Sequence, residues 1–144
     1  MSTTISDALV LSGATGNLVF KKIYPALQAL VGRGQFDMPL ICVARSGWDA
    51  DRMRARIRES LEHHGKVDEA ACAKLSTLLR YVDGDYRESS TFARLCDALG
   101  EASHPAFYLA IPPSMFPSVV ESLSKLNCSS GARIVVEKWM PTNA

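Results

Sequence analysis

The stretch ALVLSGATGNL, residues 8–18, decides the fold of this 144-residue chain. Its first four residues are apolar and predict a β-strand, and Ser12 and Gly13 predict a turn directly after that strand. Apolar side chains then recur at helical spacing over residues 17–31, where Pro25 predicts a kink or a helix in two pieces. A glycine turn between a strand and a helix is typical of a phosphate-binding turn, and a simple strand end is the alternative.

The remaining sequence repeats this alternation of strands and helices. Further strands are expected at 40–44, 81–82, 106–111 and 133–137, and further helices at 49–62, 68–79, 89–99 and 114–126. Strands that are apolar along their whole length need cover on both faces, and parallel sheets receive it from the helices that connect their strands. The sequence therefore predicts one α/β domain over residues 1–144. Its fold is a doubly wound, mostly parallel sheet of about five or six strands with helices on both faces (Rossmann-like).

Composition and charge exclude several classes of protein. Apolar residues make up 47% of the chain and charged residues 22%, as in ordinary globular domains. The 16 basic and 15 acidic residues nearly cancel, so we expect neither nucleic acid nor an anionic membrane as a partner. The alternating arginines of segment 51–59 would spread around a helix, which favours a solvated face. No apolar run reaches the ~20 residues of a membrane span, and the N-terminus lacks a signal-peptide pattern, so we expect a cytoplasmic protein.

The spacing of cysteine and histidine gives no sign of a metal site or a catalytic base. Cys42, Cys72, Cys96 and Cys128 are far apart in the sequence, without the close pairs that zinc sites use. We expect them to be free thiols, buried or half-buried in a reducing compartment. The three histidines fall at a helix end and in a loop, and none follows a strand. No metal ligand and no catalytic residue is therefore assigned.

The segments after the second and fourth strands are further binding candidates, because ligands of doubly wound sheets lie at the carboxyl ends of the strands. Arg45 and Ser46 follow the second strand, where NAD sites carry an acidic residue for the ribose. A guanidinium and a hydroxyl suit the 2′-phosphate of NADP, and a solvated surface arginine is the alternative. Ala110, Ile111 and Pro112 follow the fourth strand and leave room for a ribose and nicotinamide, although a simple strand stop explains them equally well.

Six motifs, ordered along the chain, resemble one family. They are GATGNL at 13–18, KIYP at 22–25, ARS at 44–46, GDY at 84–86, FYLAIPP at 107–113 and VVEK at 135–138. Together they resemble the N-terminal coenzyme domain of glucose-6-phosphate dehydrogenase, from about residue 8 to residue 138. The resemblance implies a domain that binds NADP. In that family a larger C-terminal domain completes the substrate site.

The resemblance also implies a set of coenzyme-binding residues. They are Gly13, Thr15, Gly16, Asn17, Leu18, Arg45, Ser46, Tyr86, Ala110, Ile111, Pro112, Glu137 and Lys138. The turn residues would line the pyrophosphate, and the Arg-Ser pair would hold the 2′-phosphate. Tyr86 would approach the adenosine, and the residues after the fourth strand would contact the ribose and nicotinamide. The last two residues would lie near the nicotinamide, where Lys138 is also the position of a sugar phosphate contact.

The reaction implied by the resemblance is the oxidation of glucose 6-phosphate by NADP⁺ to 6-phosphogluconolactone and NADPH, in the pentose phosphate pathway. The family's catalytic histidine belongs to a stretch of its second domain that has no counterpart in this sequence. We therefore expect a chain without the substrate domain, which binds NADP and does not turn over. Glucose 6-phosphate would be its partner only in a full-length context, and self-association through the surface near Trp139 is plausible.

Three departures from the family's motifs support an alternative, a non-enzymatic coenzyme-sensing or interaction module on the same fold. Asn17 stands where the family has aspartate, so a negative charge at the turn is lost. Val19 replaces a small residue and predicts tighter packing between helix and strand. Trp139 replaces the proline that follows the Glu-Lys pair. A methyltransferase-like domain is a weaker alternative, because no carboxylate follows the second strand to hold its ligand's ribose.

Overall fold

Strands and helices alternate along the chain, as the sequence predicts. The computed structural model describes residues 7–17, 19–44, 47–84, 88–100, 105–110 and 133–136, together with residues 114, 117, 119 and 121. The elements are β1 (Ala8–Ser12), the π-helical turn η1 (Val19–Ile23), α1 (Tyr24–Gly32), β2 (Leu40–Ala44), α2 (Ala50–His64), α3 (Glu69–Leu78), β3 (Leu79–Asp83), α4 (Ser89–Leu99), β4 (Pro105–Leu109) and β5 (Arg133–Val136). The expected helix at 114–126 falls mostly outside the described residues.

The five strands form one parallel sheet in the order β3-β2-β1-β4-β5. In the central strand, Val10 lies opposite Ile41 of β2 on one side and Phe107 of β4 on the other. The chain builds the sheet outward from β1 to β3 and then returns to the other side of β1 to add β4 and β5. This confirms the doubly wound prediction. The order of the strands reverses beside β1, and ligands of such sheets bind in the crevice at this point.

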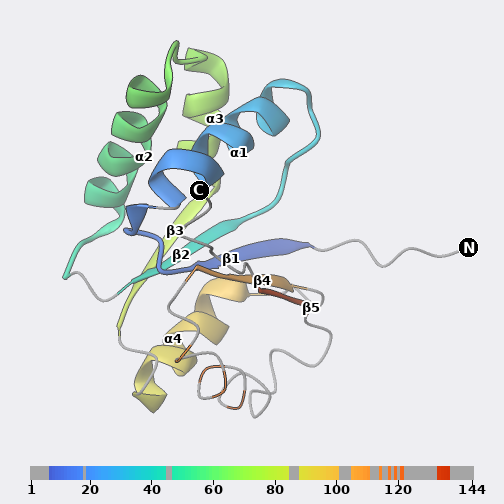
Figure 1. The fold of residues 1–144 in the computed structure, drawn as a ribbon. Helices are drawn as coiled ribbons and strands as arrows, with labels where there is room; N and C mark the ends of the chain where they lie inside the picture. Colours follow the sequence, from blue (N-terminus) through green and yellow to red (C-terminus); the bar gives the residue numbers. More distant parts are fainter. Residues whose placement is uncertain are drawn as a thin grey trace, which may run out of the picture.

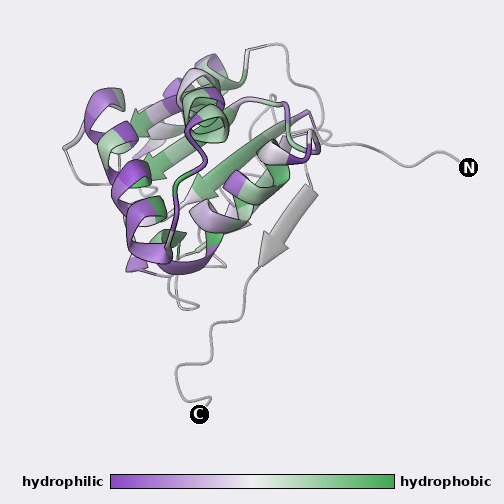
Figure 2. Cartoon of the chain, turned by 90° about the horizontal axis from the view of Figure 1, so that it is seen from above, coloured by the Kyte–Doolittle hydropathy of each residue, from purple (hydrophilic) through white to green (hydrophobic). Residues whose placement is uncertain are grey.

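Helices cover both faces of the sheet (Figure 1). α1, α2 and α3 lie on one face, where their apolar side chains form a core with Leu11, Leu40 and Cys42. α4 lies on the other face, where Phe92 and Leu95 meet the opposite side of the strands. Figure 2 shows the consequence for hydropathy, since the strands are mainly apolar while α2 is hydrophilic along its outer side. None of the helices that the structure describes is long and apolar enough to cross a membrane.

Pro25 divides the first helical region, as predicted. η1 ends at Ile23, α1 begins at Tyr24, and Pro25 lies in the first turn of α1. Proline has no N–H to donate to the preceding turn, and a wider π-helical turn before it avoids the clash that a continuous α-helix would produce. Val19 is fully buried at the start of η1 and belongs to the same core as Leu11, so its larger side chain is accommodated there.

β3 is longer than predicted and follows α3 without a loop. The sequence indicates a strand only at 81–82, yet β3 begins at Leu79. β3 stands at an edge of the sheet formed by the described strands, since it pairs only with β2 among them. Arg80 is exposed between buried Leu79 and half-buried Tyr81, and this charged residue hides the apolar pattern of the strand.

The prediction of free cysteines is wrong for Cys96. Cys42 and Cys72 are free and buried, as expected. Cys96 in α4 is disulfide-bonded, and its partner lies outside the described residues. A disulfide requires Cα atoms within about 7 Å of each other, and spacing along the sequence carries no information on that distance. Among the described residues, no group of three metal-binding side chains comes together.

Candidate functional site

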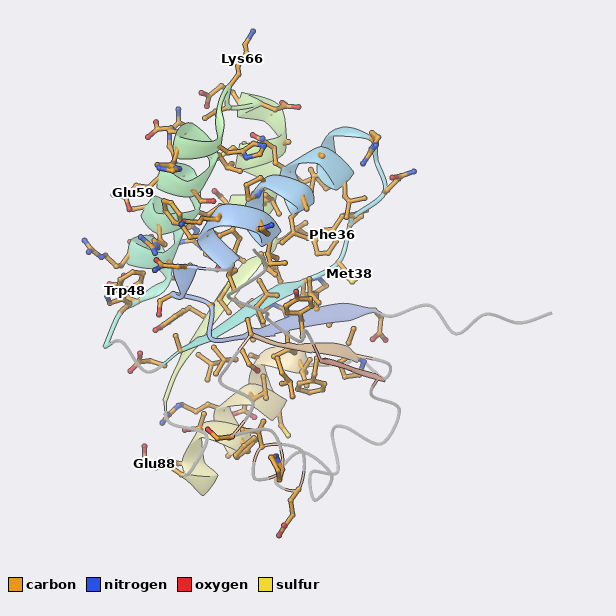
Figure 3. All side chains as sticks on the ribbon, in the orientation of Figure 1. Phe36, Met38, Trp48, Glu59, Lys66 and Glu88 are labelled. Carbon is orange, nitrogen blue, oxygen red and sulfur yellow. The ribbon has the colours of Figure 1, made fainter. Side chains whose placement is uncertain are left out.

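The segments after β1, β2 and β4 meet at one edge of the sheet. The N–H of Gly13, directly after β1, donates to the carbonyl of Val43 in β2 at 3.0 Å. The N–H of Ala110, directly after β4, donates to the carbonyl of Ser12 at 3.0 Å. Figure 3 shows the direction of β2, because Trp48 after this strand and Met38 before it lie at opposite edges. The candidate site is therefore the carboxyl edge of β1, β2 and β4, on the side of Trp48.

The turn after β1 has the shape that the glycines predict. Gly13 has a φ of 77°, which a side chain would strain, and a Cβ on Gly16 would lie 3.2 Å from the carbonyl oxygen of Gly13. The N–H groups of Gly13 and Ala14 both donate to Val43, and the N–H of Gly16 donates to Gly13. These three donors are therefore used within the protein. The glycines shape the turn, and an anion beside it would need donors from the helix start or from side chains.

Tyr24 holds the turn from the opposite side. This side chain is fully buried, and its hydroxyl donates a hydrogen bond of 2.7 Å to the carbonyl of Ala14. The hydroxyl also lies 3.7 Å from the sulfur of Cys42 in β2. Burial raises the pKa of Tyr24, and burial raises the pKa of Cys42 to about 12, so both groups stay protonated near neutral pH. Tyr24 thus joins α1, β2 and the turn.

Arg56 reaches the same turn from α2. One of its terminal nitrogens donates to the carbonyl of Thr15 at 3.2 Å, and its guanidinium carbon lies 4.0 Å from the centre of the Phe20 ring. Its Nε is buried and has no hydrogen-bond partner. The prediction of a solvated arginine face is therefore wrong for Arg56. A contact between a helix and a distant turn leaves no signal in the spacing of arginines.

The neighbouring arginines of α2 point elsewhere, as their spacing predicts. Arg54 pairs with Asp51 at 2.8 Å, and Arg58 pairs with Glu69 of α3 at 2.7 Å. The Arg58 guanidinium lowers the pKa of the Glu69 carboxyl. Both pairs are exposed to solvent, so they contribute little to stability.

Asp83 supports the loop that follows β2. Its carboxylate accepts a hydrogen bond of 2.8 Å from the N–H of Gly47 and one of 2.7 Å from the hydroxyl of Tyr81. Burial, followed by the Asp83 carboxylate, raises the pKa of Tyr81. Gly47 comes directly after the Arg45-Ser46 pair that the sequence assigns to a 2′-phosphate. No pattern in the sequence indicates this support, because Asp83 lies 36 residues from Gly47.

The loop leads into α2 through Trp48 and Asp49. The Asp49 carboxylate accepts from the N–H of Arg52 at 2.8 Å and caps the helix, as its position predicts. The Arg52 guanidinium lies 4.8 Å from the centre of the Trp48 ring. Trp48 is half-buried beside the start of α2 (Figure 3). A tryptophan at this edge of the sheet is a useful reporter of binding.

The structure describes part of the predicted set of site residues. Gly13, Thr15, Gly16 and Asn17 lie in the turn, with Asn17 exposed, and Ala110 lies beside it at the end of β4. The residues of the set that lie outside the described residues are Leu18, Arg45, Ser46, Tyr86, Ile111, Pro112, Glu137 and Lys138.

The histidines that the structure describes lie away from this edge. His63 and His64 end α2, and the ring of His63 lies 5.6 Å from that of Phe20. Lys66, two residues after His64, lies beyond the end of α2 that is opposite Trp48 (Figure 3). Within the described part of the chain, no histidine stands at the carboxyl end of a strand.

Residues 10–143 match the family described as "Glucose-6-phosphate dehydrogenase, NAD binding domain". Over 133 residues the chain is 34% identical to glucose-6-phosphate 1-dehydrogenase 1 of Mycobacterium bovis, covering 92% of this chain and 28% of that protein. It is 33% identical to "Glucose-6-phosphate 1-dehydrogenase 6, cytoplasmic" of Arabidopsis thaliana, covering 91% and 29%. The chain thus spans less than a third of the length of these relatives.

Solved structures give the same result. A crystal structure of glucose-6-phosphate 1-dehydrogenase from Mycobacterium avium superposes with a TM-score of 0.88 at 34% identity, covering 94% of this chain and 30% of that one. A glucose-6-phosphate dehydrogenase in complex with its substrate glucose-6-phosphate superposes with a TM-score of 0.78 at 26% identity, covering 94% and 31%.

Proposed function

The chain belongs to the glucose-6-phosphate dehydrogenase family by its nicotinamide dinucleotide-binding domain, and from this premise we propose that it binds NADP at the carboxyl edge of its sheet. One observation carries the proposal. The glycine turn after β1 is joined by backbone hydrogen bonds to Val43 near the end of β2, and Ala110 after β4 is joined to Ser12 at the end of β1, at the point where the strand order reverses. A dinucleotide lying across these three segments would meet the turn with its pyrophosphate.

The site fits an extended anionic coenzyme. A side chain at Gly16 would crowd the carbonyl oxygen of Gly13, so glycine keeps the turn tight and leaves its exposed side free of a side chain. Arg56 brings a guanidinium to the turn. A bound nicotinamide coenzyme would accept a hydride, and the residues of this chain would hold and orient it.

The preference for NADP over NAD rests on the loop after β2. Arg45 and Ser46 provide a cation and a hydroxyl, and no carboxylate follows the strand before Asp49, which caps α2. The carboxylate of Asp83 is engaged by Gly47 and Tyr81. A ribose bearing a 2′-phosphate would therefore meet positive charge in this loop. We propose that the residues in contact with the coenzyme are the full set assigned from the sequence, from Gly13 in the turn to Lys138.

The wider activity that we propose is the one named for the relatives, the oxidation of glucose 6-phosphate with NADP⁺, in the cytoplasm as in the plant protein's name. Removing a proton from a sugar hydroxyl requires a base near the nicotinamide. His63 and His64 lie at the end of α2. We therefore propose that the 144-residue chain on its own binds the coenzyme without oxidising the sugar phosphate.

Titration calorimetry of the chain with NADP⁺ and NAD⁺ tests the binding. We expect NADP⁺ to bind more tightly than NAD⁺ and to raise the free energy of unfolding by about 2.7 kcal/mol at a hundredfold excess over its Kd. Equal affinities for NADP⁺ and NAD⁺ would contradict the proposed preference, and an absence of binding of both would contradict the proposed function. Formation of NADPH from glucose 6-phosphate by the purified chain would contradict the lack of turnover.

A further inference from the structure

Arg56 lies beside the glycine turn and has no counter-ion within the part of the chain that the structure describes. Its guanidinium donates to the Thr15 carbonyl and stacks on Phe20. Among the described residues no carboxylate pairs with it, whereas Arg54 and Arg58 on the same helix each have one. Arg56 is partly buried, so its charge is partly removed from water, which is costly without a partner.

The Nε nitrogen of Arg56 is also without a partner in the described part of the chain. This nitrogen is buried and donates to no acceptor. A buried N–H without an acceptor destabilises the folded protein, so such a group in a native fold points to a role beyond stability. The Phe20 ring holds the plane of the guanidinium from one side, and the Thr15 carbonyl fixes one corner of it.

Three N–H groups of the turn are already used within the protein and are not available to an anion. The N–H groups of Gly13, Ala14 and Gly16 are taken by carbonyl groups of the protein. A guanidinium has five N–H donors in one plane, and a single one is used on Thr15. Arg56 therefore brings to the turn both a full positive charge and N–H groups able to form the paired hydrogen bonds that phosphate oxygens accept.

We propose that Arg56 binds a phosphate group of the coenzyme, an inference that rests on the proposed function. The phosphate is either the 2′-phosphate or the pyrophosphate, since both offer the same oxygens to a guanidinium. The contact would pair the charge of Arg56 and connect α2 to the coenzyme through the turn. Arg56 would then act together with the Arg45-Ser46 pair, which precedes the same helix.

The test compares Arg56→Gln and Arg56→Lys with the unmodified chain. Glutamine keeps a polar side chain with N–H groups but removes the charge, whereas lysine keeps the charge and loses the planar fork. We expect Arg56→Gln to weaken NADP⁺ binding about tenfold to a hundredfold, as for loss of a charge-assisted hydrogen bond, and Arg56→Lys to weaken it less. Increasing KCl should weaken NADP⁺ binding more steeply in the unmodified chain than in Arg56→Gln.

Four probes, NADP⁺, NAD⁺, 2′-AMP and ADP-ribose, identify which phosphate group Arg56 contacts. Binding of each probe is followed by titration calorimetry or by the NMR signal of the Trp48 indole N–H. A contact to the 2′-phosphate predicts that Arg56→Gln weakens NADP⁺ and 2′-AMP and leaves NAD⁺ and ADP-ribose unchanged. A contact to the pyrophosphate predicts equal losses for NADP⁺, NAD⁺ and ADP-ribose with 2′-AMP unchanged. Either pattern supports the proposal.

Arg58→Gln is the matched control. It makes the same change in charge on the same helix, at an exposed arginine paired with Glu62 and Glu69, and should bind all four probes as the unmodified chain does. The proposal would be overturned if Arg56→Gln bound all four probes as tightly as the unmodified chain does. It would also be overturned if Arg56→Gln and Arg56→Lys both lost the same affinity for all four probes. If the unmodified chain binds no probe, the proposed function fails first and this inference fails with it.

Discussion

Tyr24 joins three segments of the chain through one hydroxyl group. It donates to Ala14 in the turn, contacts the thiol of Cys42 in β2, and belongs to the first turn of α1. The sequence shows only a tyrosine at a helical position before Pro25. The pairing with Ala14, ten residues away, depends on how α1 is placed against the sheet.

Removal of this hydroxyl should loosen the turn. In Tyr24→Phe the buried carbonyl of Ala14 loses its donor, and we expect a decrease of about 1–3 kcal/mol in the free energy of unfolding, with weaker NADP⁺ binding. Urea denaturation and calorimetry measure the two effects. The same substitution in a Cys42→Ala background should have an equal effect, because the contact with Ala14 is the one that matters. An unchanged unfolding free energy would show that the hydroxyl does not fix the turn.

Cys42 should make stability depend on pH in the alkaline range. Burial raises the pKa of its thiol from 9.0 to about 12. The unfolded chain therefore ionises first as the pH rises, and the stabilisation that is complete below pH 9 is lost as the pH approaches 12. The contribution of this thiol lowers the free energy of unfolding by at most about 1.4 kcal/mol per pH unit.

Urea denaturation at intervals between pH 7.5 and about pH 11 measures this dependence. Cys42→Ala should show a shallower decline than the unmodified chain, because it removes the buried thiol and also the contribution of Cys42 to the raised pKa values of Tyr24 and Tyr81. Cys72→Ala is the control, since it removes the other free thiol. Identical slopes in the Cys42→Ala and unmodified chains would contradict the assignment.

At the scale of elements, β3 stabilises a loop to which it is not connected in sequence. Asp83 at the end of β3 accepts from the Gly47 N–H, and Tyr81 orients the same carboxylate. The loop after β2 is thereby held between its own strand, the cap of α2 and its neighbour β3. Because this loop carries Arg45 and Ser46, the edge strand affects how the proposed 2′-phosphate site is formed.

Loss of the Asp83 acceptor should reduce the preference for NADP⁺. In Asp83→Ala the Gly47 N–H has no acceptor on β3, and we expect about a tenfold loss of NADP⁺ affinity with a smaller change for NAD⁺. Asp83→Asn keeps a carbonyl acceptor and should retain most of the affinity. Asp97→Ala, which removes an exposed acid from α4, controls for charge. Titration calorimetry with both coenzymes gives the ratio, and an unchanged ratio in Asp83→Ala would contradict this role.

At the scale of the whole molecule, the sheet places its central strand, β1, beside the site. β1 pairs with β2 and β4 on its two sides and is covered by helices on both faces, whereas β3 pairs only with β2 among the described strands. The turn that follows β1 thus extends from the centre of the fold. A rigid strand that leads directly into a turn fixes the turn's backbone before a ligand arrives.

Hydrogen exchange followed by mass spectrometry should show this gradient. We expect the amides of β1 and β2 to exchange most slowly and those of β3 faster, because an edge strand opens without unfolding the sheet. Addition of NADP⁺ should slow exchange at residues 13–17 and 47–48 and leave α3 unchanged. Equal protection of β1 and β3 would contradict the gradient.

The sequence alone determined the parallel doubly wound sheet, the glycine turn after β1 and the divided first helix. Each of these depends on local properties, namely apolar runs, glycine spacing and the missing N–H of Pro25, which neighbouring residues in the sequence display. The tertiary structure decided that Arg56 reaches Thr15, that Asp83 holds Gly47, and that Cys96 is disulfide-bonded. These contacts join residues far apart in sequence, and their partners become neighbours only when the sheet and its helices pack together.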